Sequence, residues 1–227
     1  MTDSEITNLV AHALQQEGSD GLPALTALRD RVQAERGPLG PALGPVWDAL
    51  VEVTSRRHED LDALLQLSEQ RARWLASVHG PADPATIRAW VELGFAAEDE
   101  YFEPLATRAW EAVAAAPIDL DALPADVLPL VSQALRGFAA SRRAAGALDE
   151  ARRLFERDLA LNDKIAPAGS PQLALSLQNL AALLERRGER AQALALRRRQ
   201  RDTLVAIAAS RDQLTAVDEA IARLAAP

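Results

Sequence analysis

The 227-residue sequence contains no cysteine, one lysine and few aromatic residues. The absence of cysteine excludes disulfides, thiolate metal ligands and a cysteine nucleophile. Aromatic residues make up only 4% of the chain although hydrophobic residues make up 48%, so alanine and leucine dominate the apolar fraction. This mixture is typical of closely packed helices, because a sheet would be richer in β-branched and aromatic residues.

The sequence also lacks the motifs of catalytic, metal and membrane-spanning sites. His12, His58 and His79 have no histidine at a metal-ligand spacing, and the acidic cluster at 98–103 lacks the glycine of a calcium loop. No glycine-rich phosphate loop, serine elbow, signal peptide or run of roughly 20 apolar residues occurs. We therefore expect a non-enzymatic cytoplasmic protein with no cofactor, metal or membrane partner.

The net charge of −8 is unevenly distributed. Residues 1–126 carry 22 acidic and 9 basic side chains, whereas 127–227 carry 11 and 16. Arginines concentrate at 186–201, and their spread around a helix predicts that one stem packs against the core with its head group paired. The run could contact phosphates, but the acidic first half would repel a polyanion. We expect an acidic protein partner or a second copy rather than nucleic acid.

The strongest positive feature is internal repetition. A step of 42 residues carries Leu135 to Leu177 and Gly146 to Gly188, and a step of 87 residues extends the similarity back to Leu67. Repetition at this period indicates stacked helix pairs rather than one globular core. The two glycines mark turns with a left-handed backbone, which glycine adopts most easily.

Helical periodicity covers nearly the whole chain. The expected helices lie at 4–17, through 25–32 to about 36, around 47–51, 60–79, from 84, from 104, and at 126–145, 147–166, 171–187, 189–208 and 211–225. The last one is expected to cover the end of the stack, and 117–124 is the least regular stretch. Trp47 and Trp90 are expected in the core, whereas Trp74 or Trp110, on second helices, could anchor a ligand if exposed.

Small residues recur where the helices of a pair would cross. They are Gly94, Ala139 and Ala181 in the first helices, and Ala106, Ala151 and Ala193 in the second. With Trp90, Leu93, Phe138, Phe155 and Leu180 they resemble the signature of the tetratricopeptide repeat family, and the 42-residue step resembles the longer repeats of kinesin light chains. Arg197 and Gln200 depart from the apolar and small residues usual there, which indicates a degenerate final repeat.

This resemblance implies an all-α, right-handed α-α superhelix forming one domain over 1–227. The expected parts are a divergent helix pair at 1–37, tetratricopeptide-like repeats at 41–208 and a capping helix at 209–227. In such arrays the first helices line a concave groove that binds proteins or peptides. By position, the groove residues are Arg88, Glu92, Phe95, Glu98, Asp99, Gln133, Arg136, Arg143, Gln178, Asn179, Glu185 and Arg186.

Asn179 falls where kinesin-light-chain-like repeats place an asparagine that binds a ligand backbone, whereas Glu92 and Gly137 hold the equivalent positions. The first hypothesis is therefore a scaffold for a protein or peptide. A second is a self-assembling protein, a homo-oligomer joined by its acidic and basic halves. A third, a peptide-sensing regulator acting on nucleic acid, is weaker because no helix-turn-helix segment is apparent.

Overall fold

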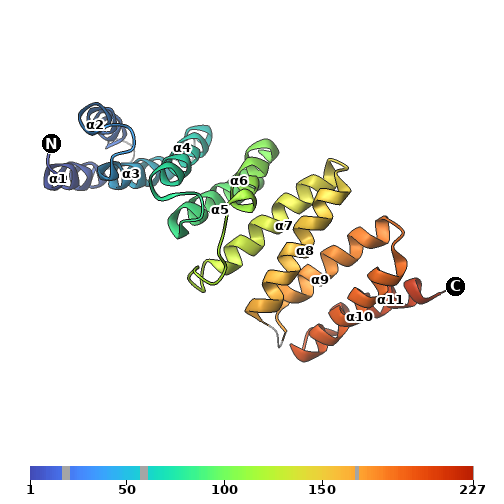
Figure 1. The fold of residues 1–227 in the computed structure, drawn as a ribbon. Coiled ribbons are helices and arrows are strands. Elements are labelled where there is room, and N and C mark those ends of the chain that lie inside the picture. The colour runs from blue at the N-terminus through green and yellow to red at the C-terminus, as the bar shows by residue number, and fades with distance from the viewer. Residues whose placement is uncertain (17–20, 57–60, 167–168, 227) are drawn as a thin grey trace. The chain divides into compact units, whose positions relative to one another are not determined.

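The computed structural model describes the chain except residues 17–20, 57–60, 167–168 and 227 (Figure 1). Within the described residues, the chain forms eleven α-helices and one short 3-10 helix, without a strand. The predicted all-α fold is therefore confirmed. No helix among these residues combines the length and apolarity needed to cross a bilayer. Of the three histidines, His58 lies outside the described residues.

The helices divide between two compact units, Met1–Leu123 (unit 1) and Pro124–Pro227 (unit 2). Within each unit, every helix packs against the next one along the chain. Unit 1 contains α1 (Asp3–Leu14), α2 (Gly21–Arg36), η1 (Pro41–Leu43), α3 (Gly44–Ser55), α4 (Leu61–His79), α5 (Pro84–Asp99) and α6 (Glu103–Ala115). Unit 2 contains α7 (Leu128–Ala144), α8 (Leu148–Ile165), α9 (Pro171–Arg186), α10 (Arg190–Ala206) and α11 (Arg211–Ala225).

The predicted helix boundaries agree with the structure to within a few residues because proline and polar caps mark them. Pro84 begins α5 behind Asp83, whose carboxylate accepts from the Ala85 N–H at 2.9 Å. Ser170 and Ser210 cap α9 and α11 in the same way. The α1 helix ends at Leu14, and the predicted end at 17 lies outside the described residues.

The turns inside the pairs α5–α6, α7–α8 and α9–α10 share one backbone geometry. Gly146 and Gly188 have φ of +80° and +76°, which confirms the predicted left-handed turns. The next residue donates its N–H to a carbonyl five residues earlier, as in a Schellman motif. In unit 1 the equivalent position holds Tyr101, with φ of +59° and the side chain 93% exposed. The sequence analysis did not identify this tyrosine as a turn residue.

The helix crossings depend on small residues, as predicted. A Cβ on Gly94 of α5 would lie 2.4 Å from the indole ring of Trp110 on α6, so only glycine permits this contact. Ala139 and Ala181, at the equivalent positions of α7 and α9, are fully buried. Trp47 and Trp90 are buried, as expected.

Trp74 and Trp110 are also buried, so neither meets the condition of exposure under which it could anchor a ligand. The physical reason is the size of the gap that small residues such as Gly94 leave on the facing helix, which the Trp110 indole fills. The last helix, α11, packs on α10 and buries Val217 against Leu204. The predicted capping helix is therefore present at the end of unit 2.

Candidate functional site

In unit 1 the candidate face is the solvent side of α5, where Glu92, Phe95 and Asp99 follow one another at helical spacing. Phe95 is 42% exposed, yet its ring stacks edge-to-face on Trp110 with centroids 5.2 Å apart. This contact fixes an apolar group at the surface. Glu92 lies 3.6 Å from Arg71 of α4, and Asp99 makes no hydrogen bond or ion pair with another described residue.

Two predicted carboxylates are already held by their own second helices. Trp110 Nε1 donates to Glu98 Oε1 at 2.9 Å, and Arg197 Nε donates to Glu185 Oε1 at 2.7 Å. The two pairs occupy equivalent repeat positions, so this bond from second helix to first helix recurs. Since the Arg197 side chain is only 11% exposed, the structure confirms that an arginine stem packs near the core with a paired head group.

In unit 2 the face of α7 contains Gln133, Arg136 and Arg143, which differ in their contacts. Arg136 points inward: its Nη1 donates to Ser132 Oγ at 2.5 Å and lies 3.4 Å from Asp158 Oδ1. Gln133 has a buried side-chain oxygen without a partner, and Arg143 is half-buried without an ion pair to any described residue.

The face of α9 combines exposed apolar and polar side chains. Leu175 is 40% exposed, and Gln178 and Arg186 are exposed beside it or farther along the helix. Gln178 Oε1 accepts from Gln200 Nε2 of α10 at 3.3 Å. Asn179 is half-buried and makes no hydrogen bond with another described residue. Its side-chain amide therefore has no partner within the described residues.

The predicted face residues thus form two groups. Some already interact with other residues of the chain, namely Arg88, Glu92, Glu98, Arg136, Gln178 and Glu185. In the second group the polar side chains make no hydrogen bond or ion pair with the described part of the chain, namely those of Asp99, Gln133, Arg143, Asn179 and Arg186. The second group is the one that can pair with a partner without breaking an internal bond.

A buried polar network joins α7, α8 and α9, and the sequence analysis missed it. Asp158 of α8 accepts from Ser132 Oγ and from Ser176 Oγ, both at 2.6 Å, and from Asn162 Nδ2 at 2.9 Å. Burial raises the pKa of the Asp158 carboxyl, while these hydrogen bonds and Arg136 lower it. The sequence contained one signal of this network: Asp158 is a charged residue at the repeat position that Val113 occupies in unit 1.

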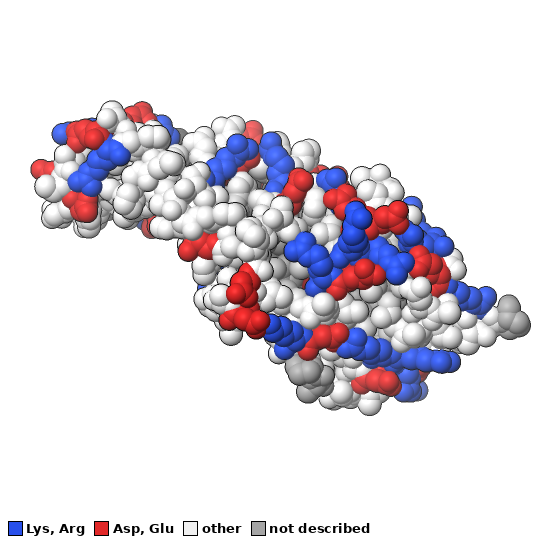
Figure 2. All heavy atoms as spheres, viewed as in Figure 1, with Lys and Arg blue, Asp and Glu red and all other residues white. Residues whose placement is uncertain are grey.

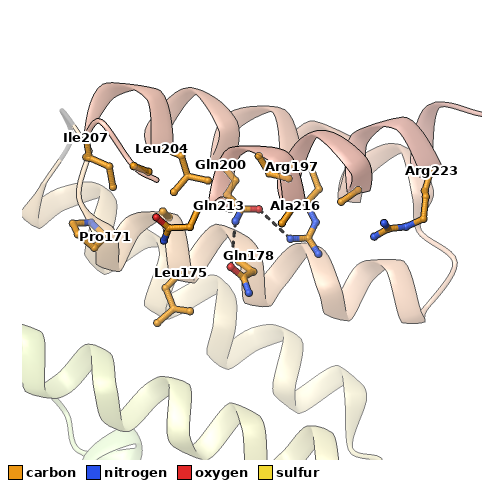
Figure 3. A pocket seen from close by; sticks show the side chains of 14 residues that line it. Pro171, Leu175, Gln178, Arg197, Gln200, Leu204, Ile207, Gln213, Ala216 and Arg223 are labelled. Atoms are coloured by element: carbon orange, nitrogen blue, oxygen red, sulfur yellow. Dashed lines mark hydrogen bonds between the residues drawn. The ribbon is translucent and has the colours of Figure 1, made fainter. Parts of the chain in front are cut away.

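A pocket of about 600 Å³ lies between α9, α10 and α11. Figure 3 shows Arg197, Gln200 and Gln178 together in it, with hydrogen bonds joining Arg197 to Gln200 and Gln200 to Gln178. The two residues that depart from the repeat pattern, Arg197 and Gln200, therefore form part of its lining. The sequence identified their unusual character but not the pocket.

Positive and negative side chains are interspersed over α7–α11 on the face seen in Figure 2. Several arginines of unit 2 have a carboxylate partner, for example Arg187 with Asp149 and Arg201 with Asp218, both at 2.6 Å. On this face, the described residues of unit 2 form no continuous basic patch of the kind a polyanion would require.

No protein-family model matches the chain, and no curated protein matches it. Solved structures do. The chain is similar to a kinesin-light-chain-like protein of Podosopora anserina with nearly identical TPR-like repeats, at 19% identity and a TM-score of 0.52, covering 98% of this chain and 99% of that chain. A point variant of it gives 19% and 0.53, covering 88% and 93%.

BtubC of P. vanneervenii is similar at 16% identity and a TM-score of 0.52, covering 92% of this chain and 92% of that chain. At this level of identity the likeness concerns the fold. Together with the recurring turns, small-residue crossings and helix order, it shows that this chain has the all-α fold of a tetratricopeptide-like repeat array.

Proposed function

We propose that this protein is a non-enzymatic scaffold that binds a protein or peptide segment through the concave face expected along its first helices. The tetratricopeptide-like fold is that of a protein-interaction scaffold. The main observation in support of this proposal is that a first helix in each unit exposes a large apolar side chain, Phe95 on α5 and Leu175 on α9.

Exposed apolar side chains beside unpaired polar groups have the character of binding hot spots. The stacking of Phe95 on Trp110 limits its motion, so little conformational entropy is lost on binding. Asn179, four residues after Leu175, offers both a donor and an acceptor for the backbone of an extended segment. These features support apolar anchoring combined with hydrogen bonding to main-chain groups.

The test is quantitative affinity capture with three single variants, followed by titration of the identified partner. Phe95→Ala and Leu175→Ala should each weaken binding of a genuine partner by tenfold or more. Val205→Ala is the matched control, because Val205 is 54% exposed on the second helix α10. If all three variants bind as the wild type does, or if only Val205→Ala weakens binding, the proposed face is wrong.

Self-association is a second candidate, supported by unpaired charge. Arg186 and Arg198 of unit 2 are exposed and make no ion pair with another described residue, whereas Asp99 of unit 1 is an exposed carboxylate without a partner. An assembly joined by such charges should dissociate as salt is raised. Static light scattering from low to high salt tests this, and a constant monomer mass throughout would exclude it.

A further inference from the structure

The pocket between α9, α10 and α11 has a polar end and an apolar end. Arg190 Nε donates to the Leu224 carbonyl at 2.6 Å, so the carboxyl end of α11 lies beside the amino end of α10. Arg197 and Arg223 therefore lie towards one end, and Ile207 with its apolar neighbours lies towards the other (Figure 3). One end can bind an anion and the other an apolar group.

The polar end contains hydrogen-bond donors that the protein leaves unused. Arg197 donates through Nε to Glu185 at 2.7 Å and through Nη1 to Gln200 at 3.0 Å, but its Nη2 has no partner among the described residues. The amide nitrogen of Gln178 and the guanidinium of Arg223 likewise have no acceptor there. These donors all line one pocket.

The charge around this end favours an anion. None of the 14 lining residues is acidic. Glu185, just outside the lining, offsets the charge of Arg197, which leaves the charge of Arg223 unbalanced. Glu219, one turn before Arg223 on α11, forms no ion pair with it. A single carboxylate would therefore match both the charge and the free donors.

The other end suits an apolar chain. Leu204, Ile207 and Val217 line it, and Val217 belongs to the buried cluster that joins α11 to the repeat. The pocket volume of about 600 Å³ falls in the range of small-molecule sites. Between Arg197 and Ile207 the helix rises about 15 Å, which leaves room for an extended ligand.

We infer that this pocket binds a small amphipathic organic carboxylate. Its carboxylate would lie between Arg197, Gln178 and Arg223, and its apolar part would lie along Leu204 and Val217. This would be a ligand site in addition to protein binding, and it does not depend on the face of α5 or α7.

Octanoate is a suitable probe, with octanol and octylamine as matched chains without a negative charge and acetate as the carboxylate without a chain. Calorimetric titration should show that octanoate binds at least tenfold more tightly than each of the three. Amide NMR spectra of the labelled protein should shift in α9, α10 and α11. Octanoate should also raise the melting temperature.

Three variants locate the site. Arg223→Gln should weaken octanoate binding at least tenfold, and Ala216→Trp should block the pocket from an exposed position of α11. Arg211→Gln is the control, because Arg211 is an exposed arginine of α11 outside the lining. Circular dichroism would confirm that all three variants remain folded.

Failure of octanoate to bind would overturn the inference, as would equal binding of octylamine or an Arg223→Gln variant with unchanged affinity. Binding of acidic peptides without any binding of small carboxylates would assign the pocket to the protein-binding face and would also overturn it. Loss of partner binding in Phe95→Ala, by contrast, tests only the face of α5, so the two proposals can fail separately.

Discussion

The two units build the crossing between first and second helix from different chemistry. In unit 1 the ring of Trp110 fills the space left by Gly94. The positions equivalent to Trp110 in unit 2 hold Phe155 and Arg197. The same position of the repeat thus accommodates an indole, a phenyl ring or a guanidinium. The residue on the facing helix and the neighbouring polar groups differ accordingly.

Three residues farther along the same second helices, the contrast is sharper. Val113 in unit 1 corresponds to Asp158 and Gln200 in unit 2, and all three are buried. Asp158 has a hydrogen-bond partner for both carboxylate oxygens, whereas the polar group around Gln200 retains unused donors beside a pocket. A satisfied polar crossing stabilises the stack, and an incompletely satisfied one creates a place for a ligand.

The largest effect is expected at the buried polar crossing. Asp158→Ala removes the acceptor for Ser132, Ser176 and Asn162 and should lower the free energy of unfolding by about 3 kcal/mol. Urea denaturation measures this. The control is Asp163→Ala, which breaks only a surface ion pair with Arg199 and should cost about 1 kcal/mol or less. Equal losses in the two variants would mean that the network adds little stability.

The crossing of α5 and α6 in unit 1 is apolar, so a substitution there should change the free energy of unfolding through steric overlap. Gly94→Ala places a methyl group 2.4 Å from the Trp110 ring and should lower the free energy of unfolding by about 2 kcal/mol. Gly44→Ala is a graded control, since its methyl group would lie 3.2 Å from Trp74. Thermal unfolding should rank the two losses in that order. A Gly94→Ala variant as stable as the wild type would show that Trp110 moves without cost.

The turns offer a pair of changes with opposite sign. Tyr101 adopts the left-handed backbone that Gly146 adopts in unit 2, so Tyr101→Gly should raise the free energy of unfolding by about 1 kcal/mol. Gly146→Ala should lower it by about 1 kcal/mol through backbone strain alone, because nothing lies within 4 Å of its Cβ. Denaturant midpoints measure both, and a destabilised Tyr101→Gly variant would reveal a stabilising contact of the tyrosine ring.

The smallest effect concerns pH. Burial raises the pKa of Asp158 above its ordinary value of 3.8, so the folded state holds this proton more tightly than the unfolded chain. The contribution of Asp158 to the free energy of unfolding should therefore decrease as pH rises from the ordinary pKa through the raised one. Comparing wild type with the non-titrating Asp158→Asn variant isolates this contribution. A difference that stays constant with pH would contradict it.

The helices and their order could be predicted because they depend on local signals. Pro84 and Ser170 mark helix starts, and Gly146 and Gly188 mark turns, whatever packs around them. The resemblance to tetratricopeptide repeats implies which positions of the first helices face a groove. The predicted groove residues lie on α5, α7 and α9. Arg136 points inward, however, and no local pattern indicates that Glu98 and Glu185 are already hydrogen-bonded.

The burial of Trp110 could not be predicted in the same way, because it depends on what lies across the crossing. Its surroundings decide whether an indole on a second helix is an anchor or a core residue. Tyr101 was missed for the opposite reason. A tyrosine gives no local signal for a left-handed turn, and its conformation follows from the Schellman bonds that the other turns share.

By itself, the sequence determined that this chain is a stack of helix pairs, since the spacing of small residues, prolines and glycines acts over a few turns of helix. The tertiary structure alone decided where polar groups meet. Asp158 finds its partners on two other helices, and the pocket beside Arg197 exists because α11 packs against α9 and α10. Such groupings depend on distances between helices, which no local pattern of residues specifies.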